Sequence, residues 1–373
     1  MKIRRYSVFD RGETGYVELS SSRCAGRHEG TGRPAFALPG QVLHDRTVLV
    51  TGANGMLATY LVYFLHYLNR VCGIRVRTVA LSRNVERMHM LFAGLEGTDA
   101  TELLVQDICR PLPPGARADY ILHLAGNASP HFIRTTPADI LLTNLEGTVR
   151  VLDAARAWNS RVLFVSTREV YGAVTGRELL GETDFGSVDP AEPRSCYPES
   201  KRAAEALLVA YGRQYGVCAN AVRMAHAYGP GMKLADDGRV MADFMAAAVE
   251  GRPIVLHSTG EAERAFCYLT DAVAGLLTVL LKAPAGEAYN LANEREPMPI
   301  KEVARLVAGV DPVRPLEVRI ELPAEQDTAY CNYKRVGLDT AKLEALGWQP
   351  RVSLREGILR TWKVAVPDEP SDG

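Results

Sequence analysis

The chain has 373 residues, of which 47% are hydrophobic, and this length and composition predict one or two domains with a sizeable core. Its 43 basic and 44 acidic residues give a net charge of −1 without a long basic run, so no nucleic-acid partner is expected. The seven cysteines are scattered without a Cys-x-x-Cys pair, which predicts no metal site and favours reduced thiols in the cytoplasm.

The first part of the chain has the character of an N-terminal arm. Residues 1–44 precede the first convincing strand, and we expect them to be partly flexible, with residues 16–19 docking on the body. Their basic start is not followed by the apolar segment of a signal peptide. Polar residues interrupt the longest apolar stretches, so no membrane span is predicted.

A glycine-rich turn follows the first predicted strand. Residues 46–51 form a short apolar run typical of a buried parallel strand, and residues 57–68 predict an apolar helix directly after it. Gly52 would allow the tight turn, and Gly55 would let a pyrophosphate approach the amides at the helix N-terminus. Ala58 stands where a third glycine is usual, so the same string is also compatible with an ordinary strand-turn-helix.

Strand and helix patterns then alternate along the chain. Strands are predicted at 76–81, 103–105, 120–124 and 162–166, and helices at 84–93 and 137–158. A helix from Tyr197 to about Tyr215 and a strand at 220–224 follow. This βαβ rhythm predicts an α/β fold with a Rossmann-type, doubly wound parallel sheet, formed by a dinucleotide-binding domain at residues 45–228.

The pattern becomes less regular after residues 229–231. Short strands are predicted at 254–256 and 318–321, and helices at 241–250, 271–282, 300–307 and 354–364. We expect residues 229–373 to form a smaller, mixed α/β, mainly substrate-binding part, with some chain returning to the first domain. Such a part suits a lid over the carboxyl ends of the strands, where open α/β sheets bind ligands.

Tyr197 and Lys201 form a Tyr-x-x-x-Lys pair on the predicted helix that begins near Tyr197. A free tyrosine has a pKa of about 10, but a lysine one helical turn away favours the phenolate. Tyr197 is then able to accept the proton of a substrate hydroxyl while the carbon gives hydride to a nicotinamide. A pair of surface residues on a helix is the alternative, because the motif is short.

Several further strings give the chain a resemblance to the extended short-chain dehydrogenase/reductase family, within its NAD-dependent nucleotide-sugar epimerases, dehydratases and decarboxylases. The resemblance covers about residues 46–365. It rests on the Tyr/Lys pair and on the strings at 51–58 (TGANGMLA), 105–108 (VQDI), 123–126 (HLAG), 143–148 (TNLEGT), 166–172 (STREVYG) and 228–231 (YGPG).

The resemblance implies bound NAD and assigns residues to it. Asp107 would meet the adenine, Asn144 would sit beneath the cofactor, and Thr167 would hydrogen-bond the reacting sugar hydroxyl. A capping or turn role is the alternative for Asp107 and Asn144. The full implied cofactor set is Gly52, Asn54, Gly55, Met56, Leu57, Ser82, Arg83, Asp107, Ile108, Leu124, Ala125, Asn144, Tyr197 and Lys201.

A finer similarity points to the UDP-glucuronate decarboxylases. It lies in the strings at 193–197 (PRSCY), 236–240 (DDGRV) and 264–266 (RAF), and it implies that Arg239 and Arg264 bind the nucleoside-diphosphate sugar. The implied reaction oxidises C4 to a ketone, releases carbon dioxide from C6 with the ketone as electron sink, and returns the hydride to C4.

Arg168 is the most informative departure from the family pattern. Dehydratases have an aspartate at this position and decarboxylases usually a serine. A guanidinium cannot protonate a departing hydroxyl, so a 4,6-dehydratase is disfavoured. Arginine does suit a carboxylate, which favours a uronic acid substrate but leaves 4-epimerisation open. For Arg168, the alternative is an ion pair with Glu169 or with a loop. For Glu169, the alternative is a buried structural carboxylate.

Two other departures concern ligand contacts. His226 replaces a substrate-binding asparagine, and a satisfied core histidine is an equal alternative. Ser82-Arg83 replaces the aspartate expected at the adenosine ribose, and an arginine there is compatible with the 2′-phosphate of NADP. NAD is favoured because a redox-neutral cycle does not draw on the NADP pool.

The sequence therefore predicts an enzyme that acts on a nucleoside-diphosphate sugar through a 4-keto intermediate, first a decarboxylase, then a 4-epimerase or ketoreductase. A non-catalytic dinucleotide sensor is the hypothesis from a different functional class, and the retained Tyr197 and Lys201 argue against it. A homodimer through a four-helix bundle is expected from the family. Its helices would be 137–158 and the Tyr197 helix, with Leu141, Leu145, Leu207 and Tyr211 on their outer faces.

Overall fold

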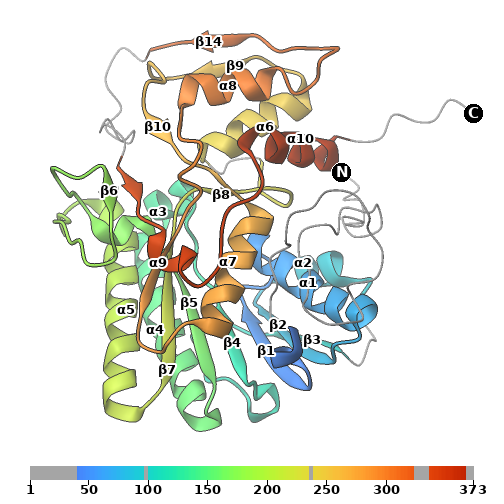
Figure 1. Cartoon of the computed structure of the whole chain (residues 1–373), viewed down its shortest axis with the longest axis vertical. Coiled ribbons are helices and arrows are strands. Elements are labelled where there is room, and N and C mark those ends of the chain that lie inside the picture. Colours follow the sequence, from blue (N-terminus) through green and yellow to red (C-terminus); the bar gives the residue numbers. More distant parts are fainter. Residues whose placement is uncertain (1–39, 96–99, 235–237, 323–335, 367–373) are drawn as a thin grey trace, which may run out of the picture.

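Seven parallel strands form the central sheet of the computed structural model, which describes residues 40–95, 100–234, 238–322 and 336–366. Their order across the sheet is β12-β7-β5-β4-β1-β2-β3 (Figure 1). The strands are β1 (Arg46–Thr51), β2 (Val76–Ser82), β3 (Thr101–Val105), β4 (Tyr120–His123), β5 (Arg161–Thr167), β7 (Cys218–Met224) and β12 (Ala288–Leu291). The predicted fold class, a doubly wound parallel α/β sheet, is confirmed.

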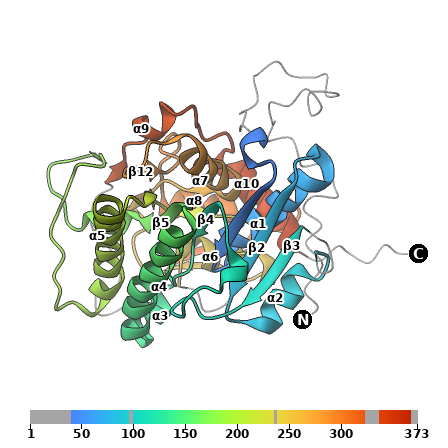
Figure 2. The same cartoon turned by 90° about the horizontal axis from the view of Figure 1, so that it is seen from below.

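Helices cover both faces of this sheet. One face carries α1 (Met56–Cys72), α2 (Val85–Phe92) and α7 (Leu269–Lys282), and the other carries α4 (Pro137–Trp158) and α5 (Cys196–Tyr215). Figure 2 shows α4 and α5 side by side on one side of the sheet and α7 on the other. Because both faces are buried, the central positions of most strands are apolar, as expected for a parallel sheet.

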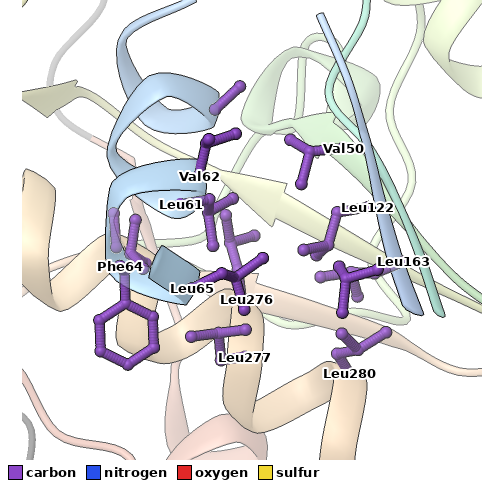
Figure 3. Packing of buried hydrophobic residues seen from close by; sticks show 14 of the residues in the cluster. Val50, Leu61, Val62, Phe64, Leu65, Leu122, Leu163, Leu276, Leu277 and Leu280 are labelled. Atoms are coloured by element: carbon purple, nitrogen blue, oxygen red, sulfur yellow. The ribbon is translucent and has the colours of Figure 1, made fainter. Parts of the chain in front are cut away.

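The alternation of side chains along β1 divides the core into two layers. Val48 and Val50 pack with α1 and α7, whereas Leu49 packs with α4 and α5. Figure 3 shows the first layer, where leucines of α1 and α7 meet side chains of β1, β4 and β5. Burying each such side chain stabilises the fold by about 1.5–3 kcal/mol relative to leaving it exposed.

A third group of elements has its own apolar core. It contains α6 (Val240–Glu250), α8 (Ile300–Ala308), α10 (Leu354–Ala365), β9 (Ile254–Leu256) and β14 (Val318–Ile320). Figure 1 shows this group above the central sheet. The chain enters it directly from the carboxyl end of β7, through β8 (Ala227–Tyr228), which pairs with β11 (Cys267–Tyr268).

Short elements complete the chain. Two further two-stranded pairs join β6 (Leu179–Leu180) with β15 (Gly337–Leu338) and β10 (Glu263–Arg264) with β13 (Met298–Pro299). The remaining helices are α3 (Pro130–Thr135), α9 (Ala341–Glu344) and the 3₁₀ turns η1 (Gly40–Leu43), η2 (Pro114–Ala116), η3 (Arg168–Tyr171) and η4 (Pro193–Ser195). None of the helices in the described ranges combines the length and apolar character that a membrane crossing requires.

Strand β12 and helix α3 were not predicted. The β12 strand has only four residues, and the fully buried Asn290 interrupts its apolar pattern. Its side-chain amide donates to the carbonyl groups of Leu180 and Asp339, and its oxygen accepts from the Tyr171 hydroxyl. Most of the expected N-terminal arm, including the docking of residues 16–19, and residues 236–237 of the loop string lie outside the described residues.

Candidate active site

The carboxyl ends of β1 and β4 meet at the point where the chain changes direction across the sheet, which is where open α/β sheets form a ligand crevice. Gly52 has a φ of +67°, and a Cβ there would lie 2.8 Å from the Cα of Ala125. Only glycine satisfies both conditions. Gly55 precedes α1 without a side-chain cap, so the backbone amides of Met56 and Leu57 begin the helix uncapped.

The outer part of this crevice holds an ion pair between two predicted cofactor residues. Arg83 follows β2, and its Nη1 lies 3.9 Å from Oδ2 of Asp107, which follows β3. Asp107 Oδ1 accepts a hydrogen bond from the Cys109 amide at 2.9 Å, and this bond is the main cause that lowers the pKa of Asp107. Asp107 thus has the turn role expected as its alternative. Ser82 and Ile108 are buried beside the pair.

A buried hydrogen-bonded chain lies beneath the crevice and is centred on His123 of β4. The Thr148 hydroxyl donates to the Asn144 carbonyl at 2.6 Å, so it accepts from Nε2 of His123. Nδ1 then accepts from the Thr51 hydroxyl at 2.8 Å, and Thr51 in turn accepts from the amides of Leu124 and Ala125. The neutral imidazole therefore connects β1, β4 and α4.

The Asn144 side chain extends from α4 toward α5, the helix that carries Tyr197 and Lys201. Its Nδ2 donates to the Ser200 hydroxyl at 2.9 Å, while its Oδ1 is buried without a donor among the described residues. A Cβ at Gly126 would lie 2.6 Å from that oxygen and 3.4 Å from Nζ of Lys201. The glycine cradle at Gly52 and this unsatisfied oxygen both fit a bound dinucleotide, and Asn54, Met56 and Leu57 lie in the turn and the first helical residues after Gly52.

Tyr197 and Lys201 are both buried near the start of α5. Nζ of Lys201 donates to the Val165 carbonyl at 2.9 Å, and burial lowers the pKa of Lys201 to about 8, with the Glu205 carboxylate opposing that shift. The pKa of Tyr197 is raised, first by burial and then by Glu169. The expected stabilisation of the Tyr197 phenolate by Lys201 is therefore smaller than the effect of burial, which favours the neutral phenol.

Glu169 lies in η3, directly after β5, and pairs with an arginine of η4. Nη2 of Arg194 donates to Oε1 of Glu169 at 2.7 Å, and the Glu169 amide donates to the Thr167 hydroxyl at 3.2 Å. The Glu169 side chain is 31% exposed, so the predicted alternative of a buried structural carboxylate is wrong. Glu169 and the Thr167 side chain both act on the pKa of Tyr197, so the structure brings these predicted catalytic residues close together.

Arg168, His226 and Arg264 line one cleft, together with Glu263 and Glu294. His226 has a left-handed backbone with φ of +46°, a conformation that histidine adopts more readily than most residues. Burial, followed by the charges of Arg168 and Arg264, lowers the pKa of His226 to about 3. The cleft thus presents two guanidinium groups, a neutral imidazole and two carboxylates, so an anionic ligand at its arginines competes with Glu263 and Glu294.

The remaining predicted substrate residue lies elsewhere. Arg239 is the exposed residue before α6 and is not among the cleft-lining residues, although its charge lowers the pKa of Tyr197. Arg168 Nε donates to the Val336 carbonyl at 3.4 Å, which is a hydrogen bond to a backbone group and not the ion pair expected as its alternative. Within the described ranges, no group of three or more His, Cys, Asp or Glu residues could hold a metal ion.

The sequence did not predict four of the charged residues around this site. They are Arg194, Glu205, Arg223 and Glu294. Arg223 gave the clearest signal, because a charged residue inside an otherwise apolar buried strand needs a partner. Its partner, Glu205 of α5, has no comparable signal in the sequence.

A doubly wound sheet with a glycine turn and a buried Tyr/Lys pair defines a dinucleotide-dependent enzyme of the extended short-chain dehydrogenase/reductase type. The chain belongs to the NAD dependent epimerase/dehydratase family, whose model matches residues 48–292.

Known relatives and solved structures agree with that assignment. The chain is 33% identical over 318 residues to UDP-glucuronic acid decarboxylase 6 of Arabidopsis thaliana, covering 83% of this chain and 86% of the relative. It is 36% identical over 257 residues to decarboxylase 5 of the same plant, covering 69% and 72%. UDP-glucose 4-epimerase of Thermotoga maritima, solved with UDP-glucose, shares the fold with a TM-score of 0.71 at 23% identity, covering 85% of this chain and 98% of that one.

The His123 chain generates a prediction about acid stability. Burial, with the charge of Lys201 adding to it, lowers the pKa of His123 to about 3. Below about pH 6.5 the unfolded chain binds a proton that the folded protein excludes, so stability present above that pH is lost as the pH falls toward 3. Between pH 7 and 5 this residue should remove about 2 kcal/mol from the free energy of unfolding, measured by urea titration.

His123→Asn should therefore show a smaller loss over the same pH interval, because asparagine does not titrate. The control is His131→Asn, in which an exposed histidine of α3 is removed. Equal pH slopes in wild type and His123→Asn would contradict the assignment.

Proposed function

We propose that the protein is a UDP-glucuronate decarboxylase-like enzyme that oxidises the sugar C4 hydroxyl with bound NAD to a transient 4-keto intermediate. The observation that carries the proposal is the cleft lined by Arg168 and Arg264, because Arg168 lies between Thr167 and Glu169 in the chain and both of these act on Tyr197. The relatives named as UDP-glucuronic acid decarboxylases support it.

Each residue of the cluster has a defined task in this reaction. Tyr197 takes the proton of the C4 hydroxyl and later returns it, and Thr167 orients that hydroxyl. Bound NAD supplies the hydride acceptor at C4 and the same hydride for the return step. Lys201 places positive charge beside the phenol, and Glu169 faces C5, where a proton is needed once carbon dioxide has left.

Arg168 defines the substrate class in this proposal. A guanidinium stays protonated at all physiological pH values, so it cannot serve as the acid that a dehydratase needs at C6. Its planar fork matches a carboxylate, and a charge-assisted pair of this kind favours a UDP-uronate over a neutral UDP-hexose. His226 and Arg264 line the same cleft, and Arg239, which directly precedes α6, is proposed to contact the nucleotide part of the substrate.

A UDP-uronate 4-epimerase is the second candidate, and the same cleft favours it. Two guanidinium groups that hold the C6 carboxylate would stabilise it as an anion and so oppose loss of carbon dioxide. The deciding experiment is mass spectrometry of products from a panel of UDP-, dTDP-, GDP- and CDP-sugars. A product lighter than UDP-glucuronate by carbon dioxide supports the decarboxylase, and an isomer of unchanged mass supports the epimerase.

NAD rather than NADP is the proposed cofactor, and the protein is proposed to work in the cytoplasm. Asp107 lies within ion-pair distance of Arg83, so the arginine has a negative partner without a 2′-phosphate. A negative carboxylate at this point also repels a phosphate. Scattered cysteines without a pairing motif are the basis for the cytoplasmic location.

The proposed assembly is a homodimer through α4 and α5. These helices lie side by side on an outer side of the molecule (Figure 2). Leu142 and Val209 are 51% and 47% exposed on them, whereas Leu207 and Tyr211 are partly buried against the core. Leu141 and Leu145 are half-buried on α4.

Tyr197→Phe should abolish turnover of UDP-glucuronate while the protein still binds NAD, because the ring packs but no group accepts the hydroxyl proton. General acid–base catalysis is typically worth about a hundredfold or more, so retention of over about a tenth of the wild-type rate would remove Tyr197 from this role. Tyr211→Phe is the matched control, since it removes a hydroxyl from the same helix at its contact with Asp153.

Arg168→Ala should erase the preference for UDP-glucuronate over UDP-glucose. Loss of a buried charged hydrogen bond costs about 2 kcal/mol or more, which is over about tenfold in the ratio of dissociation constants. Calorimetric titration of both ligands gives that ratio, and Arg252→Ala, which removes an exposed arginine paired with Glu250, is the control. Indifference to the carboxylate in both wild type and Arg168→Ala would exclude a uronate substrate.

Arg83→Ala tests the cofactor preference by titration with NAD and NADP. If Arg83 contacts a 2′-phosphate, NADP binding should weaken by more than about tenfold while NAD binding changes little, because only NADP loses a charge-assisted contact. Asp107→Asn should act in the opposite sense and improve NADP binding. Equal effects of Arg83→Ala on both dinucleotides would show that it does not discriminate between them.

Light scattering at micromolar concentration should give the mass of a dimer. Leu142→Asp combined with Val209→Asp should shift the mass toward that of a monomer, because two charges then replace exposed apolar side chains. Val313→Asp, at a residue that is 82% exposed, is the control. A monomeric wild type would contradict the proposed assembly.

A further inference from the structure

A buried ion pair lies one helical turn beyond Lys201 on α5. Glu205 accepts from Nη2 of Arg223 at 2.7 Å and from its Nε at 3.1 Å to each carboxylate oxygen. The two side chains are only 14% and 8% exposed. Nη1 of Arg223 donates to the Glu182 carbonyl at 2.9 Å, so the guanidinium has partners on two sides.

The same pair is bonded to the elements that carry the proposed catalytic residues. The Ser166 hydroxyl donates to Oε1 of Glu205 at 2.5 Å, and Ser166 directly precedes Thr167 at the end of β5. The guanidinium carbon of Arg223 lies 4.9 Å from the ring centre of Tyr171, which ends the η3 turn that holds Glu169. The pair thus connects α5, β5, β7 and η3.

Stability alone is a weak explanation for this arrangement. Removing two charges from water costs several kcal/mol per ion, and buried ion pairs are often replaceable by apolar residues without loss of stability. The place of this pair suggests a second task. Its carboxylate is on the same helix as Lys201, four residues later, where side chains share a face.

Few charged or titratable groups act on Lys201 in the described structure. They are Glu205 on its own helix, His123 on β4, and Arg223 on β7 through its pair with Glu205, while Tyr197 lies one turn earlier on α5. His123 is neutral, as its hydrogen bonds require. Glu205 is therefore the negative charge that favours a protonated Lys201, and Arg223 determines how much of that charge Lys201 experiences.

We propose that the Glu205–Arg223 pair is a positioning unit for Lys201, which keeps its ammonium group charged beside the Val165 carbonyl and aligns α5 with Thr167. The proposal rests on the proposed roles of Tyr197 and Lys201 in the reaction. Two substitutions that break the same ion pair separate this task from a merely structural one. Glu205→Gln removes the negative charge near Lys201, whereas Arg223→Met leaves it unbalanced.

The measurement is the titration of Lys201 itself, followed by NMR in protein with lysine labelled by ¹³C at Cε. The Lys201 signal is identified by its loss in Lys201→Arg. Glu205→Gln should lower the pKa of Lys201 and Arg223→Met should raise it, each by about half a unit or more, as expected for the loss of a close charge. A structural role alone does not produce shifts of opposite sign.

Glu205→Asp is the matched control, because it keeps the carboxylate and should leave the pKa of Lys201 closest to wild type. Thermal melting checks that each variant is folded. If Arg223→Met does not fold, Glu205→Gln still decides, since an unchanged or raised pKa of Lys201 in that variant overturns the proposal. Shifts of the same sign in both variants overturn it as well.

An activity assay with UDP-glucuronate separates this proposal from the proposed function. If wild type turns over no nucleotide sugar, the function fails while the NMR titration still tests the pair. In an active enzyme, Glu205→Gln should reduce kcat by more than about tenfold with KM for the sugar nearly unchanged, and the alkaline limb of the kcat profile should move to lower pH. An unchanged kcat would overturn the positioning role.

Discussion

The close approach of two backbone segments, at Gly52 and at Ala125, is the constraint on which the rest of the site depends. It forces a left-handed glycine after β1 and brings the loop after β4 against the start of α1. The Thr51 hydroxyl maintains this approach by accepting the amides of Leu124 and Ala125. The crevice that receives a dinucleotide is therefore built from backbone, and side chains determine only its edges.

Around this crevice, burial is the main influence on the protonation of the titratable side chains. Lys201, Tyr197 and His123 are all held toward their neutral forms by loss of water, and neighbouring groups oppose or assist this effect at each of them. The cleft at Arg168 and Arg264 is different, because its guanidinium groups keep their charge whatever their surroundings. The site thus combines a nearly neutral reacting cluster with a cleft in which guanidinium groups lie among carboxylates, so the charge that faces an anionic sugar nucleotide depends on how these groups pair.

Much of the fold follows from local patterns. The predicted bounds of α4 and β1 match the structure because Pro137 starts the helix and an apolar run precedes Gly52. The strand at Asn290 escaped prediction because its polarity is satisfied by groups from segments that lie far away in sequence. The pairing of Glu169 with Arg194 has the same origin: η3 and η4 meet only after the chain has folded. Residue types at the site were readable from the sequence, but their partners were not.

The position of β12 has a consequence for how the chain is made. This strand pairs with β7 at the edge of the sheet, yet it is the last of the seven to be synthesised. Until residues 288–291 leave the ribosome, β7 presents an unpaired edge, and the carbonyl partners that Asn220 of β7 finds at Pro284 and Glu287 do not yet exist. A nascent chain of about 230 residues, which already contains the whole glycine turn and Tyr/Lys pair, consequently exposes this unpaired edge to wrong strand pairing.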